Sequence, residues 1–326
     1  MTIEEITSEE LKKRDKVIQF IDAQKRDIAQ EVGNKKAINA LSGGVDSSTV
    51  TMLGHKALGD KLITYFIDNG LMREGEPERV VQTFSDLGVS VELINAQPVF
   101  FEALRGIKDP EEKRGAIVNA FYKGIFKTLI EESGAEYLLQ GTILTDIDET
   151  AAGIKRQHNV FKQIGIDPEK AFGYKILEPL VQLRKDGVKI VAKELGLPES
   201  VYNRKPFPGP ALAARVIGEV TPEKIKLVRK ATSIIEQILD PIKETFQNLA
   251  ILHEDKVTGI RDGKRDFGYQ IEVRSWKSKD ARKATPYIPG QAALLELSHR
   301  LTTEVPGVVS VTYNITGKPP STMEAI

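Results

Sequence analysis

Apolar and charged residues alternate along the first half of the chain in two rhythms, one typical of helices and one of buried strands. Residues 1–33 carry apolar side chains at helical spacing up to Gly33, which predicts an amphipathic helix. A strand is expected at 36–41, followed by a turn at Ser42-Gly43-Gly44 and a helix that ends near Gly59. The same order repeats, with strands at 62–67, 89–94 and 137–140 and helical stretches at 76–87 and 98–133. This alternation predicts an α/β domain built on a doubly wound parallel sheet.

The pattern changes after about residue 200. Residues 204–210 hold three prolines and a glycine, too many for a helix or a central strand. We therefore place a boundary there, with domains at 1–205 and 206–326. A helix at 222–239 and strand-like runs at 248–252, 268–274 and 308–315 predict a smaller α+β domain. Four cations of that helix, Lys224, Lys226, Arg229 and Lys230, are expected on a solvated face, and Trp276 in the core.

Composition narrows the possible functions. The 326 residues include no cysteine, which excludes disulfides, thiolate metal sites and a cysteine nucleophile. Lys plus Arg equals Asp plus Glu, at 46 each, so no net positive field favours a nucleic acid partner. The sequence has no run of about 18 apolar residues and a charged N-terminus, so we expect a cytoplasmic protein with no membrane partner.

The segment SGGVDSS, from Ser42 to Ser48, carries the first chemical signal. Two glycines permit a sharp turn in which backbone N–H groups point inward at the start of a helix, an arrangement that binds phosphate. The alternative is a plain strand-to-helix turn. The segment lacks the lysine of a Walker A loop and the spacing of a dinucleotide fingerprint.

SGGVDSS is similar to the signature loop of the N-type ATP pyrophosphatases, which cleave ATP between the α and β phosphates. Within that family, further segments resemble GMP synthases. They are Tyr65 to Arg73 (like FVDNGLLR), Gln140-Gly141-Thr142 with Asp146 and Glu149, Lys155 with His158-Asn159-Val160, Pro206 to Pro210 (PFPGP), and Gly317 to Glu324 (like GKPPATxE). The last segment is the most discriminating, because NAD synthetases share the loop and lack this tail.

Three segments depart from the GMP synthase pattern. Phe161-Lys162 follows His158-Asn159-Val160 where GGLP is usual, Ala211 follows PFPGP where glycine is common, and Asp280 to Ala284 replaces DFMTA. These changes leave the ATP half of the pattern intact and concern the substrate half.

The resemblance implies an adenine nucleotide alpha hydrolase-like fold, a C-terminal dimerisation domain and a homodimer. It implies that the 2-oxo group of xanthosine monophosphate (XMP) is adenylated by ATP with Mg²⁺ and then displaced by ammonia, giving GMP, AMP and pyrophosphate. Because the chain has no cysteine, ammonia would be free or come from a separate glutamine amidotransferase subunit.

The resemblance also assigns residues. ATP and pyrophosphate would be bound by Ser42, Gly43, Gly44, Val45, Asp46, Ser47, Ser48, Asp68 and Lys155, with Asp46 and Lys155 catalytic. Magnesium would lie near Asp46 and Glu149, although the acidic pair Asp146 and Glu149 could equally be a solvated loop. The substrate nucleotide would be bound by Arg265, Lys318 and Glu324, with Lys318 facing its phosphate.

Other functions remain compatible with the loop. One is a different adenylating N-type ATP pyrophosphatase, such as an NAD synthetase-like amidating enzyme or a tRNA-modifying enzyme. Another is a nucleotide-binding regulator without catalysis. The formation of AMP and pyrophosphate, and the added substrate that it requires, separates these possibilities.

Overall fold

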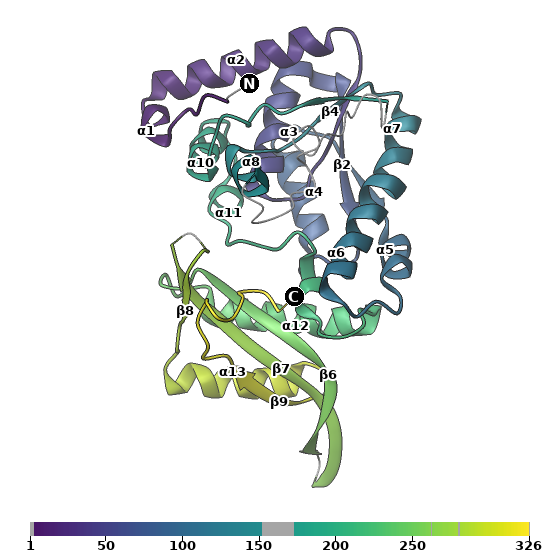
Figure 1. Cartoon of the computed structure of the whole chain (residues 1–326), viewed down its shortest axis with the longest axis vertical. Coiled ribbons are helices and arrows are strands. Elements are labelled where there is room, and N and C mark those ends of the chain that lie inside the picture. The colour runs from purple at the N-terminus through teal and green to yellow at the C-terminus, as the bar shows by residue number, and fades with distance from the viewer. Residues whose placement is uncertain (1–2, 152–172, 262, 280, 326) are drawn as a thin grey trace. The chain divides into compact units, whose positions relative to one another are not determined.

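The computed structural model describes residues 3–151, 173–261, 263–279 and 281–325. They form two compact units, which Figure 1 shows in the order of the chain. The first unit comprises Met1–Ile67, Pro77–Ile94 and Phe121–Arg204. The second comprises Asp68–Glu76, Asn95–Ala120 and Lys205–Ile326, so it draws on three separate stretches of sequence.

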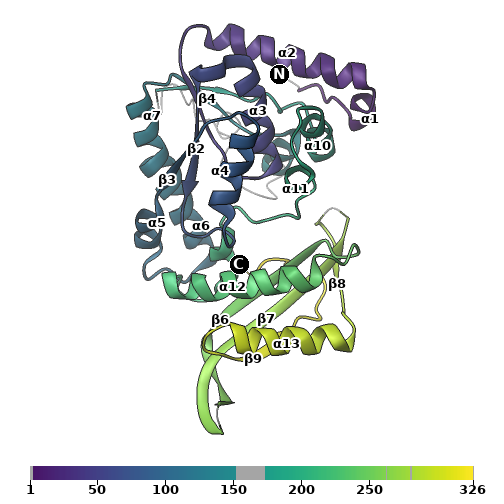
Figure 2. The same cartoon turned by 180° about the vertical axis from the view of Figure 1, so that it is seen from behind.

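The first unit contains a sheet flanked by helices (Figures 1 and 2). Its strands are β1 (Ala37–Ala40), β2 (Leu62–Asp68), β3 (Val91–Asn95), β4 (Tyr137–Leu139) and β5 (Lys175–Leu177). Its helical segments are α1 (Ser8–Leu11), α2 (Arg14–Val32), α3 (Val45–Leu58), η1 (Gly59–Lys61), α4 (Glu76–Asp86), η2 (Ala120–Phe126), α7 (Lys127–Ser133), α8 (Leu144–Ala151), α10 (Lys185–Glu194) and α11 (Glu199–Tyr202).

The strand order of this sheet is β3-β2-β1-β4-β5. Strand β1 pairs in parallel with β2 and β4, and β4 pairs in parallel with β5. Because the order reverses at β1, ligands are expected beyond the carboxyl ends of β1 and β4, where the two halves of the sheet diverge. The doubly wound α/β fold predicted from the alternating pattern is confirmed.

Helix α3 is buried along most of its length and packs against β1, β4 and helix α2. Gly54 of α3 is required by this packing, since a Cβ there would lie 2.6 Å from Leu139 and 2.8 Å from Leu62. Helix α2 follows the predicted amphipathic pattern and ends at Gly33, which adopts a φ of 58°. The start of α3 is therefore held firmly beneath the loop that precedes it.

The second unit is an α+β structure. Its strands are β6 (Gln247–Arg261), β7 (Lys264–Ser278), β8 (Ala284–Pro286) and β9 (Val308–Tyr313). Its helical segments are α5 (Gln97–Leu104), α6 (Pro110–Asn119), η4 (Ala211–Arg215), α12 (Pro222–Leu239) and α13 (Gln291–Glu304). The predicted α+β class is confirmed, and the helix expected at 222–239 has those bounds.

Strand β7 is the centre of the second sheet. It pairs antiparallel with β6 and β8 and parallel with β9. Helices α12 and α13 lie side by side against this sheet (Figure 2). Trp276 of β7 is fully buried in a cluster with Leu249, Ile251, Ala284 and Met323, which confirms its predicted place in the core.

Side chains and backbone of the three stretches join the second unit together. Lys113 of α6 is fully buried and donates to the Val216 carbonyl at 2.8 Å. Burial lowers the pKa of Lys113 to about 8. The Leu212 N–H donates to the Leu71 carbonyl at 2.9 Å. Stretches 68–76 and 95–120 are thus integral to this unit.

The expectation of a solvated cationic face on α12 is wrong for two of its four residues. Arg229 donates to the carbonyls of Gly70 and Met72, and Lys224 donates to the Glu219 carbonyl and to Glu254. Lys226 is exposed, as expected. Helical spacing identifies which residues share a face, but it contains no information about partners that are distant in sequence.

Glu254 accepts hydrogen bonds from Lys224 at 2.9 Å and from Lys108 at 3.1 Å. These two bonds, the Lys224 bond first, lower the pKa of Glu254 to about 2 despite partial burial. A carboxylate whose pKa is depressed on folding stabilises the fold fully above its unfolded pKa, and this stabilisation is lost as the pH falls towards the folded pKa.

Glu254→Gln is therefore expected to lower the free energy of unfolding by about 1 kcal/mol at neutral pH, a modest value because the Glu254 side chain is 34% exposed. The difference from wild type should shrink as the pH falls from about 4.5 towards 2. Thermal unfolding across this range measures it, with Asp255→Asn on the same strand as the matched control. A difference that grows on acidification would contradict the assigned ion pairs.

Candidate functional site

The loop Ser42 to Ser48 joins β1 to α3 in the first unit. Gly43 adopts a φ of 75°, a conformation that favours glycine, and Gly44 is the N-cap residue of α3. The Ser47 hydroxyl accepts from the Ser42 N–H at 3.1 Å and lies 2.9 Å from the Ser42 hydroxyl. Serine side chains thus close the loop on itself, while no side chain caps the helix.

Several polar groups of this loop have no protein partner. The first N–H groups of a helix have no intrahelical acceptor, and the helix dipole adds a partial positive charge there. Within the described part of the chain, Asp46 Oδ1 and the fully buried Ser48 hydroxyl also lack hydrogen-bond partners. A buried polar atom without a partner is costly, so these atoms indicate a ligand site.

Neighbouring segments of the first unit support the loop. Gly141, directly after β4, must be small because a Cβ there would lie 3.2 Å from the backbone of Asp46 and Ser47. Lys185 at the start of α10 forms an ion pair with Asp46 Oδ2 at 2.6 Å. Arg204 donates to the Gly43 carbonyl at 3.2 Å. The loop is therefore surrounded by two cations and by the predicted Gln140-Gly141-Thr142 segment.

The acidic pair lies on α8. The Asp146 carboxylate accepts from the Ile143 N–H at 3.1 Å and so caps the start of this helix, and Glu149 follows one turn later. Among the described residues, no three His, Asp or Glu side chains are grouped to hold a metal ion. Magnesium is commonly held by only one or two carboxylates together with substrate phosphates, so the buried Asp46 Oδ1 fits such an ion.

Asp68 ends β2 and shapes a tight turn in the second unit. Its carboxylate accepts from the Gly70 N–H at 2.9 Å and from the Gln97 side chain at 2.6 Å. Gly70 adopts a φ of 73°, and a Cβ there would lie 2.7 Å from Phe101. The turn is further held by Arg229, and it presents Arg73 at its end.

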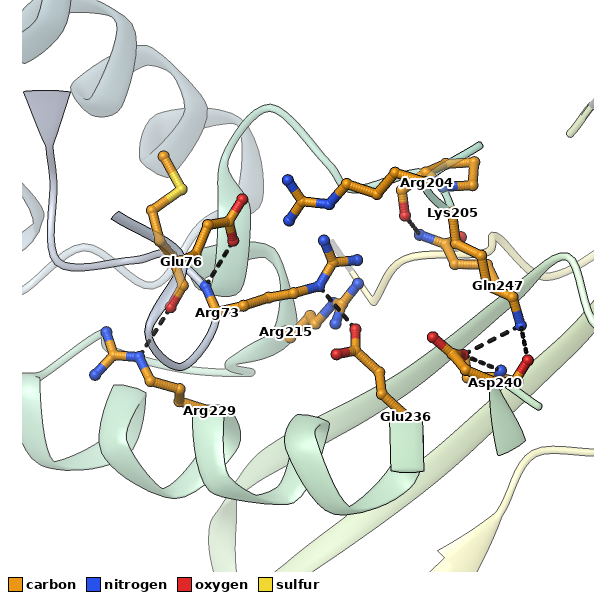
Figure 3. Close-up of polar contacts among 12 residues, drawn as sticks. Arg73, Glu76, Arg204, Lys205, Arg215, Arg229, Glu236, Asp240 and Gln247 are labelled. Atoms are coloured by element: carbon orange, nitrogen blue, oxygen red, sulfur yellow. Dashed lines mark hydrogen bonds and ion pairs between the residues drawn. The ribbon is translucent and has the colours of Figure 1, made fainter. Parts of the chain in front are cut away.

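Arg73 and Arg215 meet around one aromatic ring in the second unit. The guanidinium carbons of Arg73 and Arg215 lie 4.0 and 4.9 Å from the centre of the Phe207 ring, which belongs to the PFPGP segment. Arg73 pairs with Glu236 of α12 at 2.7 Å (Figure 3). Arg215 is fully buried, and its Nη1 and Nη2 atoms have no partner among the described residues.

Glu324 in the C-terminal tail belongs to the same cluster. Its carboxylate accepts from Arg215 Nε at 3.3 Å and from Gln247 Nε2 at 2.8 Å. Two arginines, an aromatic ring and a carboxylate can together bind a planar, anionic molecule with polar ring atoms. The structure thus brings the predicted Glu324 together with Arg73 and Arg215.

The other two predicted substrate residues lie apart within one chain. Lys318 forms a backbone bridge with Ala284, beside the end of β7, and its amine donates to the Ala281 carbonyl at 2.8 Å. Arg265 is exposed near the opposite end of β7. The tail and the segment that departs from DFMTA do meet, through a main-chain carbonyl that any side chain there would leave in place.

Some sequence predictions lie outside the described residues, namely Lys155, His158 and Phe161-Lys162. Ala211, the departure after PFPGP, adopts a φ of 53°, which explains why glycine suits that position.

Three cations were not singled out as site residues by the sequence. Arg73 ends a motif that was quoted for its resemblance alone, and Lys185 lies in an ordinary charged stretch. Arg215 follows a short alanine-rich run, a weak sign that it would be buried.

Comparison with known proteins agrees with this geometry. The family model described as GMP synthase C terminal domain matches residues 236–325, and the model described as NAD synthase matches 17–124. Curated relatives, each named as a subunit of glutamine-hydrolyzing GMP synthase, are 47% identical in Pyrococcus furiosus, 46% in Archaeoglobus fulgidus and 44% in Methanocaldococcus jannaschii. Each alignment covers 94% of this chain and 96%, 99% and 97% of the respective relative.

Among solved structures, an NH3-dependent NAD synthetase from Campylobacter jejuni in complex with nitrate ion has a TM-score of 0.45 at 14% identity, covering 60% of this chain and 80% of that one.

An α/β sheet with a phosphate-binding loop after its central strand, joined to a separate unit that concentrates arginines, defines an ATP-dependent synthetase. The particular family follows from the relatives: the chain belongs to the GMP synthase family, among those members whose synthetase is a subunit of its own. Within the described residues, no helix has the length and apolar character needed to cross a bilayer.

Proposed function

We propose that this protein is the synthetase subunit of a GMP synthase, a ligase that converts XMP and ammonia to GMP while ATP becomes AMP and pyrophosphate. The observation that carries the proposal is the SGGVDSS loop, with unpartnered polar atoms at the start of α3, in a chain that aligns with GMP synthase subunits over 94% of its length. NAD synthetase-like amidation and tRNA modification are not favoured, because those enzymes do not share the C-terminal match at 236–325.

The reaction needs a good leaving group on the purine. The 2-oxo oxygen of XMP attacks the α-phosphorus of ATP and pyrophosphate departs. Ammonia then adds at C2, and the oxygen leaves as part of AMP. We assign the departing pyrophosphate to the N–H groups of Gly44, Val45 and Asp46, to the Ser47 and Ser48 hydroxyls and to Lys185, because fixed donors stabilise developing negative charge without reorganising.

Magnesium would be held by Asp46, with Glu149 as the further predicted carboxylate, and would neutralise charge on the phosphate oxygens. In the described structure Asp46 is shared: one oxygen pairs with Lys185 and the other is buried without a partner. Asp46 thus orients Lys185 towards the loop whether or not an ion is bound. Lys155 remains a proposed catalytic cation from the resemblance alone.

We propose that the second unit binds XMP. Arg73 and Arg215 supply positive charge, Phe207 lies beneath both guanidinium groups, and the Glu324 carboxylate can accept from a purine N–H. Lys318 is proposed to face the substrate phosphate, with its amine already oriented by Ala281. Residues 1–205 are accordingly proposed as the ATP pyrophosphatase domain, and 206–326 as the substrate and dimerisation domain.

A homodimer is proposed through the second unit. Ile260 and Phe267 on the projecting β6–β7 hairpin are 81% and 60% exposed, unusually high for large apolar side chains. Arg265 lies on the same hairpin, so in a dimer it could serve the partner copy. A cytoplasmic location is proposed because all the substrates are soluble metabolites.

The proposed function is tested by incubating the purified chain with ATP, MgCl2, XMP and ammonium chloride. GMP, AMP and pyrophosphate should form in equal amounts. Glutamine in place of ammonium should give no GMP until a glutaminase subunit is added, since this chain has no cysteine to attack glutamine. GMP formation from glutamine by this chain alone would refute the separate-subunit proposal, and amidation of nicotinic acid adenine dinucleotide instead of XMP would refute the substrate.

A further inference from the structure

The last residues of the chain are held by side chains of β7. After the bridge at Lys318, the tail has no strand pairing among its described residues. Instead, three consecutive carbonyls accept from two β7 residues. Arg274 Nη1 donates to Thr322 at 3.1 Å and to Glu324 at 3.3 Å, and Trp276 Nε1 donates to Met323 at 3.3 Å.

These donors share one face of the second sheet. Trp276 and Arg274 are two residues apart on β7, and they lie opposite Gln247 and Leu249 of β6. Gln247 holds the Glu324 side chain, whereas Arg274 holds its main chain. The face therefore determines both the path of the tail and the direction of the Glu324 carboxylate.

Arg274 is itself locked in place. Its Nε donates to Glu272 at 2.6 Å, and the second oxygen of Glu272 lies 2.9 Å from His253 Nε2. The side chains of Arg274 and Glu272 are only 12% and 15% exposed. Burial raises the pKa of Glu272, but the hydrogen bonds from His253 and Arg274 outweigh it and the pKa lies below its usual value. Glu272 is thus a fixed carboxylate that orients the guanidinium.

We propose that Arg274 is a positioning residue for the nucleotide substrate: by holding the Thr322 and Glu324 carbonyls it fixes the Glu324 carboxylate beside Arg215, without touching the substrate itself. The proposal rests on the proposed function in one respect, the place of Glu324 in the XMP site. An arginine suits this task because its planar fork reaches Glu272 and two carbonyls at once, whereas a lysine offers one nitrogen.

The tail carries its own reporter. Trp276 is the only tryptophan of the sequence, it is fully buried, and its indole N–H is bonded to the tail. Its fluorescence therefore reports tail docking without substrate, ATP or turnover. Release of the tail should shift the emission to longer wavelength and speed digestion by carboxypeptidase.

The test uses the full chain with Arg274→Gln, and Lys277→Gln on the same strand as the matched control, because Lys277 contacts Glu244 and lies away from the tail. Arg274→Gln should release the tail by both readouts and raise the apparent KM for XMP roughly ten- to a hundredfold, with the KM for ATP within about twofold of wild type. Arg274→Lys should not restore docking. Glu272→Gln, which keeps the shape of the side chain, should give smaller changes of the same sign and serves if Arg274→Gln misfolds.

The outcomes separate the two ideas. A docked tail in folded Arg274→Gln would overturn the positioning role whatever the activity. A released tail with an unchanged KM for XMP would overturn the link from Arg274 to substrate and remove Glu324 from the proposed site. If the wild type makes no GMP from ammonium, the proposed function fails, while the fluorescence and digestion data still decide whether Arg274 fixes the tail.

Discussion

Asp46→Ala is expected to lower the rate of pyrophosphate release by on the order of a hundredfold or more. The change removes the buried oxygen that fits a magnesium ion, and it also removes the partner that orients Lys185. Asp46 lies in the first turn of α3 and is not part of the hydrophobic core, so the fold should persist. A coupled assay for pyrophosphate, with circular dichroism for the fold, measures both.

Asp27→Ala provides the comparison, since Asp27 is an exposed residue of α2 in the same unit. Lys185→Ala should fall between the control and Asp46→Ala, because it removes one cation and leaves the carboxylate. Near-normal pyrophosphate release by Asp46→Ala would mean that the loop does not serve ATP.

Arg215→Met is expected to weaken XMP binding roughly ten- to a hundredfold while leaving ATP binding nearly unchanged. The methionine occupies similar space beside Phe207 but removes the two unpartnered Nη donors and the bond to Glu324. Loss of charge-assisted bonds to an anionic nucleotide is the physical reason. Titration of each nucleotide, followed by isothermal calorimetry, measures the two affinities separately.

Arg105→Met, an exposed position with only a local ion pair to Glu102, controls for loss of one positive charge. If Arg215→Met weakened ATP and XMP equally, the arginine cluster would belong to a general structural role. No change in either affinity would exclude it from substrate binding.

Local signals predicted the first unit well. The two glycines after β1 and the start of α3 at Val45 follow from backbone preferences that act within a few residues. Helix α12 was equally predictable, because Thr221 caps it and Pro222 occupies its first position.

What the sequence did not predict depends on pairing over long distances. The outer halves of β6 and β7 are rich in charged residues, and they are strands because they pair with each other. Strands β5 and β8 are three residues long, too short for a periodic signal. Helix α13 was also not anticipated, although its apolar spacing is regular.

The same limit applies to the candidate site. Arg215 and Glu324 are 109 positions apart, so their contact is visible only once the chain is folded. The SGGVDSS loop could be recognised because its residues are contiguous. The nucleotide cluster of the second unit could be predicted only in part, through the tail residues Lys318 and Glu324.

The three-stretch construction of the second unit constrains how the chain can be made and cut. Lys113 of α6 needs the carbonyl of Val216, and Leu71 needs the N–H of Leu212, so the early segments leave the ribosome long before their partners exist. A fragment that begins at residue 206 would lack α5, α6 and the turn that holds Arg73. The C-terminal half should therefore be obtained as a stable species only together with the early segments, and native maturation must wait until synthesis is nearly complete.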